Sequence, residues 1–271
     1  MFHVKQRSDD VIPGGASEAE QGEAEPSPRD GDGGVDGAAG PTGGAEGPAV
    51  PDAAALRIAA AGHADAALVV YREQLARFRR TLDLMSDRGF AELDAKMAEA
   101  ERYAAAIAVH AVPLGAVLDL GTGAGLPGVV VAARLAPRRV WWVERRRRRA
   151  AFLDQTAAHA GLREVRVAAA DVRTLDVSAT GRVAAVTAQA VASIDQVAAL
   201  TRHLWSDDVL LVSRKGPGWE AEVEALRGAA HGWGAYGGSA GVEVVATEAL
   251  GSGGTLVAVR VRGGSACPPS A

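Results

Sequence analysis

The chain has 271 residues, of which 48% are apolar and 23% are charged, and its formal net charge is −4. The only cysteine, Cys267, lies in a Gly/Ser/Pro-rich terminus, which excludes a disulfide framework. No apolar run is long enough to span a bilayer and the start MFHVKQRSDD lacks the apolar core of a signal peptide, so we expect a cytoplasmic protein with no membrane partner.

Residues 1–55 differ in composition from the rest of the chain. They hold 11 of the 33 glycines, and 11 acidic residues against three basic ones. Such a segment cannot bury enough apolar surface to offset chain entropy, so we expect a disordered acidic leader. The remainder carries 26 basic residues against 22 acidic ones, a mildly basic body that is compatible with a nucleic-acid partner.

Residues 56–112 are predicted to form an N-terminal helical extension. Apolar residues at three- and four-residue spacings place one face of the first helix inward, namely Leu68, Tyr71, Leu75, Phe78 and Leu82. We expect this helix to break at Gly89. A second helix follows at about Ala91–His110, and Pro113 and Gly115 end it.

From residue 113 to 263 the pattern alternates between strands and helices, and residues 264–271 form a flexible terminus. The strands are expected at 116–120, 139–144, 165–171, 183–190, 208–216, 242–250 and 255–263. The alternation predicts an α/β fold with a mostly parallel seven-stranded sheet covered by helices on both faces. The short link GSGG between the last two strands predicts an antiparallel hairpin at the sheet edge.

The stretch LDLGTGAGLPG after the first strand is a glycine loop with two interpretations. Gly123, Gly125 and Gly128 satisfy the dinucleotide pattern G-x-G-x-x-G. Asp119 and three glycines, Gly121, Gly123 and Gly125, fit the acid and G-x-G-x-G of an S-adenosylmethionine site. We favour S-adenosylmethionine, because the strand ends at Leu120 and because Asp119 can orient the loop and attract a positive ammonium or sulfonium.

Two further carboxylates follow neighbouring strands. Glu144 ends the second strand, where it can accept hydrogen bonds from both ribose hydroxyls of either cofactor. Asp171 ends the third strand, near an adenine amino group, although an N-cap for the following turn is an equally good interpretation.

The segment from Arg145 to Arg149 places five arginines at the rim where ligands bind. Consecutive residues on a helix point in all directions, so they cannot all serve one ligand. The run is either a solvated basic rim or a contact with a nucleic-acid backbone. Trp141 and Trp142 point to opposite faces of their strand and are expected to pack. The histidines show no metal-ligand spacing, so no metal site is expected.

Several segments resemble the bacterial small-subunit ribosomal RNA guanine-N7 methyltransferases, the RsmG (GidB) type. The Leu-Pro-Gly at 126–128 after three glycines is distinctive, and WWVERRRRRAAFLDQ, AVTAQAVASIDQV and LLVSRKG resemble later segments of that family. The resemblance covers roughly residues 68–262. It implies a class I S-adenosylmethionine-dependent methyltransferase fold (Rossmann-like).

The resemblance also implies the site and the substrate. The methyl donor would lie at Gly121 to Leu126, with adenine near Asp171, Val172 and Arg173. The substrate would be a guanine in 16S rRNA, free or in the small ribosomal subunit, and we expect a monomeric enzyme. Guanine N7 carries a lone pair in the neutral base and needs no general base. Catalysis would then rest on positioning, for which Gln189 and Lys215 are the candidates.

The chain departs from the family pattern on the substrate side. Gln189 stands where the family has an arginine, AERYAA (100–105) replaces an Arg-His-x-x-Asp-Ser segment, and Asp83-Leu84-Met85 replaces Asn-Leu-Thr. Arg214, Lys215 or the arginine run could compensate. The alternatives to rRNA methylation are a methyltransferase for another substrate, a silent RNA-binding module and a nicotinamide dehydrogenase.

Overall fold

The computed structural model describes residues 53–234 and 238–264, all within one compact unit. Almost all of the leader expected at 1–55 lies outside the described residues, as do Cys267 and all but the first residue of the terminus expected at 264–271. Among the helices of the described ranges, none combines the length and the apolar character that crossing a membrane requires.

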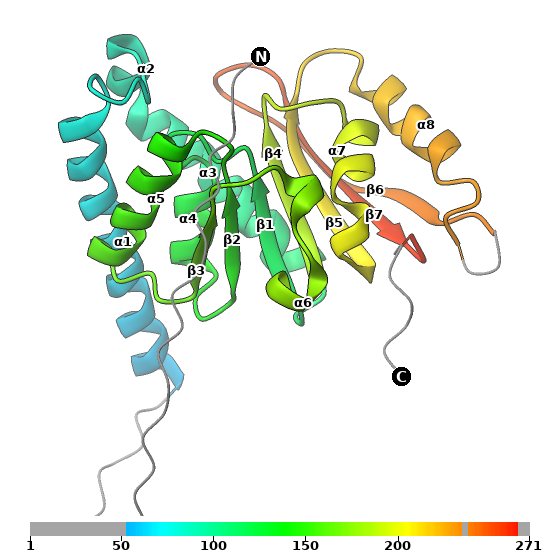
Figure 1. Cartoon of the computed structure of the whole chain (residues 1–271), viewed down its shortest axis with the longest axis horizontal. Coiled ribbons are helices and arrows are strands. Elements are labelled where there is room, and N and C mark those ends of the chain that lie inside the picture. The colour runs from blue at the N-terminus through cyan, green and yellow to red at the C-terminus, as the bar shows by residue number, and fades with distance from the viewer. Residues whose placement is uncertain (1–52, 235–237, 265–271) are drawn as a thin grey trace, which may run out of the picture. The chain divides into compact units, whose positions relative to one another are not determined.

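A seven-stranded sheet forms the centre of the molecule (Figure 1), with the strand order β3-β2-β1-β4-β5-β7-β6. Neighbours from β3 to β5 pair in parallel, whereas β7 is antiparallel to both β5 and β6. This arrangement confirms the predicted class I methyltransferase fold. The strands are β1 (Ala116–Leu120), β2 (Val140–Val143), β3 (Val165–Ala168), β4 (Val183–Gln189), β5 (Trp205–Lys215), β6 (Gly241–Ala249) and β7 (Thr255–Arg262).

Helices cover both faces of the sheet and bury two apolar clusters. One face carries α1 (Ala53–Phe78), α3 (Leu93–His110), α4 (Gly128–Arg134) and α5 (Arg147–His159), and the other carries α6 (Val177–Thr180), α7 (Ile194–Thr201) and α8 (Trp219–Ala229). Alternation along the strands divides the apolar residues between the faces, so Trp142 joins the first cluster and Trp141 packs against the second. Both tryptophans therefore pack, as expected.

The N-terminal helices differ in one detail from the sequence expectation. The first helix ends at Phe78 rather than near Gly89, and a separate short helix α2 spans Asp87–Ala91. The hydroxyl of Ser86 accepts a hydrogen bond from the Gly89 amide at 3.1 Å, so Ser86 caps a new helix instead of continuing the old one. The domain boundary expected between residues 112 and 113 stays a prediction.

A buried polar corner joins β1 to the start of α4. Asp119 is 1% exposed, and its Oδ1 accepts a hydrogen bond from the Thr187 hydroxyl at 2.5 Å. Burial raises the pKa of Asp119 to about 7. A Cβ atom added to Gly128 would lie 2.5 Å from Oδ2 of Asp119 and 2.9 Å from Nε1 of Trp142. Gly128 therefore lets α4 start directly above the carboxylate.

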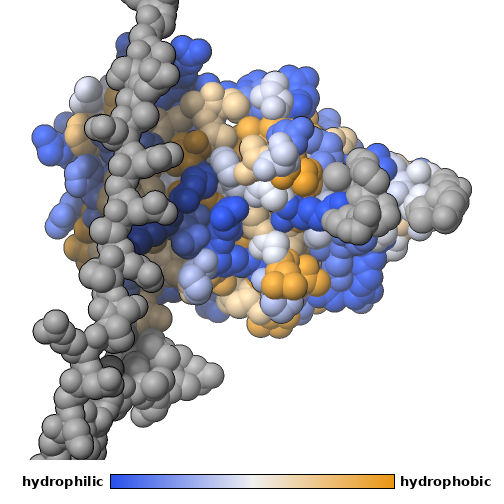
Figure 2. Space-filling model, turned by 60° about the horizontal axis from the view of Figure 1, so that its bottom comes forward, coloured by the Kyte–Doolittle hydropathy of each residue, from blue (hydrophilic) through white to orange (hydrophobic). Residues whose placement is uncertain are grey.

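The amino ends of the parallel strands β1 to β5 form the lower end of the molecule in Figure 1, which Figure 2 brings forward. Hydrophilic and hydrophobic residues are interspersed over the part of this end that the view leaves uncovered (Figure 2). Arg139 and Arg163 are exposed there, immediately before β2 and β3. This end carries positive charge far from the carboxyl ends of the strands.

We predict that Gly128→Ala destabilises the chain by about 1–3 kcal/mol, because the new methyl group has no room beside Asp119 and Trp142. The matched control is Gly228→Ala in α8, where nothing lies within 4 Å of the added Cβ. There alanine should stabilise the helix by about 0.5–1 kcal/mol. Urea unfolding of both variants measures the difference, and equal effects of the two substitutions would contradict this account of the corner.

We predict that Asp119 makes stability fall as the pH rises. Its folded-state pKa of about 7 lies above the ordinary value of 3.8, so between these values the folded chain holds a proton that the unfolded chain has lost. Relative to Asp119→Asn, the wild type should lose on the order of 2–4 kcal/mol of unfolding free energy between pH 4 and pH 8. Urea titrations across this range test the sign, and parallel pH profiles would refute it.

Candidate functional site

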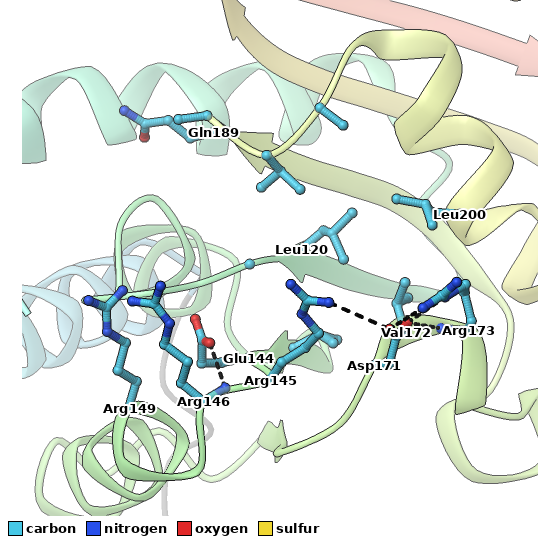
Figure 3. A pocket seen from close by; sticks show the side chains of 15 residues that line it. Leu120, Glu144, Arg145, Arg146, Arg149, Asp171, Val172, Arg173, Gln189 and Leu200 are labelled. Atoms are coloured by element: carbon cyan, nitrogen blue, oxygen red, sulfur yellow. Dashed lines mark hydrogen bonds and ion pairs between the residues drawn. The ribbon is translucent and has the colours of Figure 1, made fainter.

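A cavity of about 450 Å³ opens at the carboxyl ends of β1, β2 and β4 (Figure 3). This is the edge at which open α/β sheets bind their ligands. Its lining comes from the glycine loop, the β2–α5 connection, the turn after β3 and the β4–α7 loop. The lining residues are Leu120, Gly121, Val143, Glu144, Arg145, Arg146, Arg149, Asp171, Val172, Arg173, Gln189, Ala190, Val191, Ala192 and Leu200.

The glycine loop adopts backbone conformations that favour glycine at all three alternate positions. The φ angles of Gly121, Gly123 and Gly125 are 70°, 59° and 118°. A Cβ on Gly121 would lie 2.9 Å from Cγ2 of Val191, and a Cβ on Gly125 would lie 2.9 Å from the ring of Tyr71. The bare backbone therefore fits between the β4–α7 loop and helix α1.

Glu144 ties the glycine loop to the β2–α5 connection. Its Oε2 accepts a hydrogen bond from the Gly123 amide at 3.1 Å, and its Oε1 accepts one from the Arg146 amide at 2.8 Å. The residue is 8% exposed and lines the cavity. An ionised carboxylate offers about four acceptor sites, so capacity remains for hydroxyl groups of a ligand.

Asp171 also lines the cavity, and its carboxylate is already engaged. It accepts hydrogen bonds from the Arg173 amide at 3.0 Å and from the Arg173 guanidinium at 2.7 Å, and so caps the short 3₁₀ turn Val172–Thr174. These bonds hold the pKa of Asp171 well below its usual range. The N-cap that the sequence left open is present, and Val172 and Arg173 line the cavity beside it.

Several expected site residues do not line the cavity. Asp119 faces the start of α4, so the geometry gives it a place under the loop rather than beside a bound cation. Gly123 and Gly125 belong to the glycine loop but do not line the cavity. Leu126 packs against the apolar cluster on the face that carries α1 and α4. Of the expected loop residues from Gly121 to Leu126, Gly121 is the one whose atoms line the cavity.

The two expected catalytic residues have different positions. Gln189 ends β4 and lines the cavity, above Arg146 and Arg149 in Figure 3. Lys215 does not line it: its ammonium donates to the Ala192 carbonyl at 2.6 Å and pairs with Glu222 at 2.8 Å. With its side chain 9% exposed, Lys215 holds the β4–α7 loop, and its expected role in positioning a substrate stays a prediction.

Sequence reasoning missed the residues that hold this loop in place. Glu222 of α8 accepts a hydrogen bond from the Ile194 amide at 2.9 Å, so the Lys215–Glu222 pair fixes both ends of the segment Ala192–Ile194. Ala190 has a φ of 56°, which is rare for a residue other than glycine. No sequence pattern marks these contacts. Tyr71, in contrast, lay on the predicted inward face of the first helix.

Among the described residues no group of three or more histidine, cysteine or acidic side chains is placed to hold a metal ion. Gly128, the third glycine of the alternative dinucleotide pattern, is buried against Asp119 and Trp142. It is required for packing and not for contact with a ligand in the cavity.

The comparisons with known proteins agree with these observations. A protein called ribosomal RNA small subunit methyltransferase G from Novosphingobium aromaticivorans is 38% identical over 109 residues, or 40% of this chain and 46% of that protein. The protein of that name from Acidothermus cellulolyticus is 37% identical over 134 residues, 49% of this chain and 57% of its own length. The chain thus spans about half the length of these curated relatives.

Among solved structures, the O-methyltransferase TomG from Streptomyces achromogenes has a TM-score of 0.48 at 17% identity, covering 72% of this chain and 90% of its own. The family model described as rRNA small subunit methyltransferase G (GidB) matches residues 65–232, which include β1 to β5 and every residue that lines the cavity. The chain therefore belongs to the rRNA small subunit methyltransferase G family.

Proposed function

We propose that the chain is an S-adenosylmethionine-dependent methyltransferase that methylates N7 of a guanine in 16S rRNA. It would act in the cytoplasm, on the RNA itself or on the small ribosomal subunit. We expect it to act as a monomer. One observation supports this proposal most directly. In a chain of this family, the Glu144 carboxylate lines the cavity and accepts a hydrogen bond from the glycine loop.

The cavity fits the proposed cofactor in size and in chemistry. Its volume of about 450 Å³ lies in the range of about 300–1,000 Å³ typical of small-molecule sites. The buried carboxylate of Glu144 has acceptor capacity for the two ribose hydroxyls. Val172 and Arg173 would border the adenine, and the bare backbone of Gly121 would allow the closest approach.

When bound, S-adenosylmethionine supplies an electrophilic methyl group on a sulfonium. Two carboxylates, Glu144 and Asp171, line the cavity and are its candidate general bases. Glu144 already accepts two amide hydrogen bonds, and Asp171 is bound by Arg173. Guanine N7 suits such a site, because its lone pair is free in the neutral base and no proton must be removed. The chain's task is then to hold and orient the base, and Gln189 is the lining side chain with both a donor and an acceptor for that task.

The direct test is to incubate the purified chain and S-adenosylmethionine with small ribosomal subunits and with free 16S rRNA from cells that lack the gene, and then to map N7-methylguanine. We expect one modified guanine in at least one substrate. Binding of the cofactor without any N7-methylguanine would sink the rRNA proposal and would favour another substrate or a silent RNA-binding module. Tight binding of NAD in place of S-adenosylmethionine would favour a dehydrogenase.

We predict that Glu144→Gln weakens S-adenosylmethionine binding at least tenfold, because hydrogen bonds to a charged group contribute about 1.5–3 kcal/mol. Isothermal titration calorimetry measures the affinity, and a thermal melt reports whether the glycine loop still supports the fold. The matched control is Glu164→Gln, an exposed carboxylate just before β3 at the opposite end of the sheet. An unchanged affinity in Glu144→Gln would remove the carboxylate from the cofactor site.

A further inference from the structure

A dense positive surface begins beside the cavity, at the start of α5. Arg145, Arg146, Arg147 and Arg148 are all exposed, and the first turn of α5 contains no acidic residue. Cations at a helix N-terminus oppose the helix dipole. The arrangement therefore lowers the stability of the isolated chain, and a bound anion would relieve it.

The contacts of the five arginines separate them into two groups. Arg149 is fixed, because its guanidinium donates to the Asp83 carbonyl at 2.6 Å and its side chain is 20% exposed. Arg145 lies 3.8 Å from Asp171, a carboxylate that Arg173 already binds. The guanidinium groups of Arg146, Arg147 and Arg148 make no hydrogen bond or ion pair with any described residue. We call these three the arginine rim.

The arginine rim starts at the cavity and leads away from it. Arg146 lines the cavity, and its own amide is bound to Glu144, so its main chain is fixed while its guanidinium points toward the space below Gln189 (Figure 3). Arg147 and Arg148 follow in the first turn of α5, at steps of about 100° around the helix axis. The three guanidinium groups point in different directions from the cavity. A single small anion could not contact all of them, whereas a polyanion with several separated charges could.

We propose that the arginine rim binds the phosphate backbone of the RNA strand that carries the target base into the cavity. This inference rests on the proposed function, since it assumes an RNA substrate. A guanidinium presents a planar fork of donors that matches two phosphate oxygens. Arg214 and Lys215 are committed elsewhere, because Arg214 donates to the Gly253 carbonyl at 2.8 Å and Lys215 holds Ala192. The rim therefore supplies the positive charge that Gln189 lacks.

The test compares two variants with the same change in net charge. One is Arg146→Gln/Arg147→Gln/Arg148→Gln, and the control at the amino ends of the parallel strands is Arg139→Gln/Arg163→Gln/Arg166→Gln. Arg166 is exposed near the start of β3, and its guanidinium donates to the Arg163 and Val165 carbonyls. Fluorescence anisotropy measures the dissociation constant of a labelled 16S rRNA fragment between 50 and 300 mM KCl. Each lost phosphate contact reduces the slope of log affinity against log salt by about 0.7–0.9, so the rim variant should lose roughly two units of slope and the control almost none.

Calorimetry with S-adenosylmethionine separates the rim from the cofactor site. It uses Arg147→Gln/Arg148→Gln, because Arg147 and Arg148 do not line the cavity, and this variant and the control should bind the cofactor within about twofold of wild type. Equal loss of RNA affinity in the rim and control variants, or loss of cofactor binding in Arg147→Gln/Arg148→Gln, would overturn the inference. Arg146→Gln alone, which should lower the slope by about 0.7–0.9, provides the same test if the triple variant does not fold. Failure of the wild type to form N7-methylguanine would instead count against the proposed function and would leave the salt comparison valid.

Discussion

The site depends on one buried carboxylate. Glu144 stands at the end of β2 and accepts amide hydrogen bonds from Gly123 on one side and Arg146 on the other. The glycine loop and the β2–α5 connection, about twenty residues apart in the sequence, are thus joined through a single side chain. These two hydrogen bonds fix the glycine loop, one wall of the cavity and the main chain of Arg146. Movement of Glu144 would therefore displace all three together. A carboxylate bound in this way is preorganised before any ligand arrives.

The opposite wall of the cavity is held by a second polar joint. The β4–α7 loop is bound by Lys215 from β5 and Glu222 from α8. In this loop Ala190 has a strained conformation, and Val191 packs against Gly121. Strain of this kind persists only where the surrounding contacts fix the backbone. The lysine thus acts through the loop it positions. The family resemblance predicts that it also helps to position the substrate, and that role stays a prediction.

The sequence was sufficient for the architecture because the relevant signals are local. Glycines at alternate positions, carboxylates at strand ends and alternation of strands with helices each reflect short-range physics, and Gly121, Glu144, Val172 and Gln189 duly line the cavity. The direction of individual side chains could not be predicted from local patterns. Asp119 points under α4 and Lys215 points to Ala192, and these directions follow from tertiary packing across the sheet. The break of the first helix at Phe78 was also missed, since Ser86 caps a helix of only five residues.

The contact between Tyr71 and Gly125 links the helical extension to the cofactor loop. Tyr71 is fully buried, and its ring fills the space that a side chain at position 125 would need. The N-terminal helices are therefore coupled to the glycine loop through this contact. A relative that replaced them with an unrelated substrate-recognition module would need a new aromatic support behind the loop.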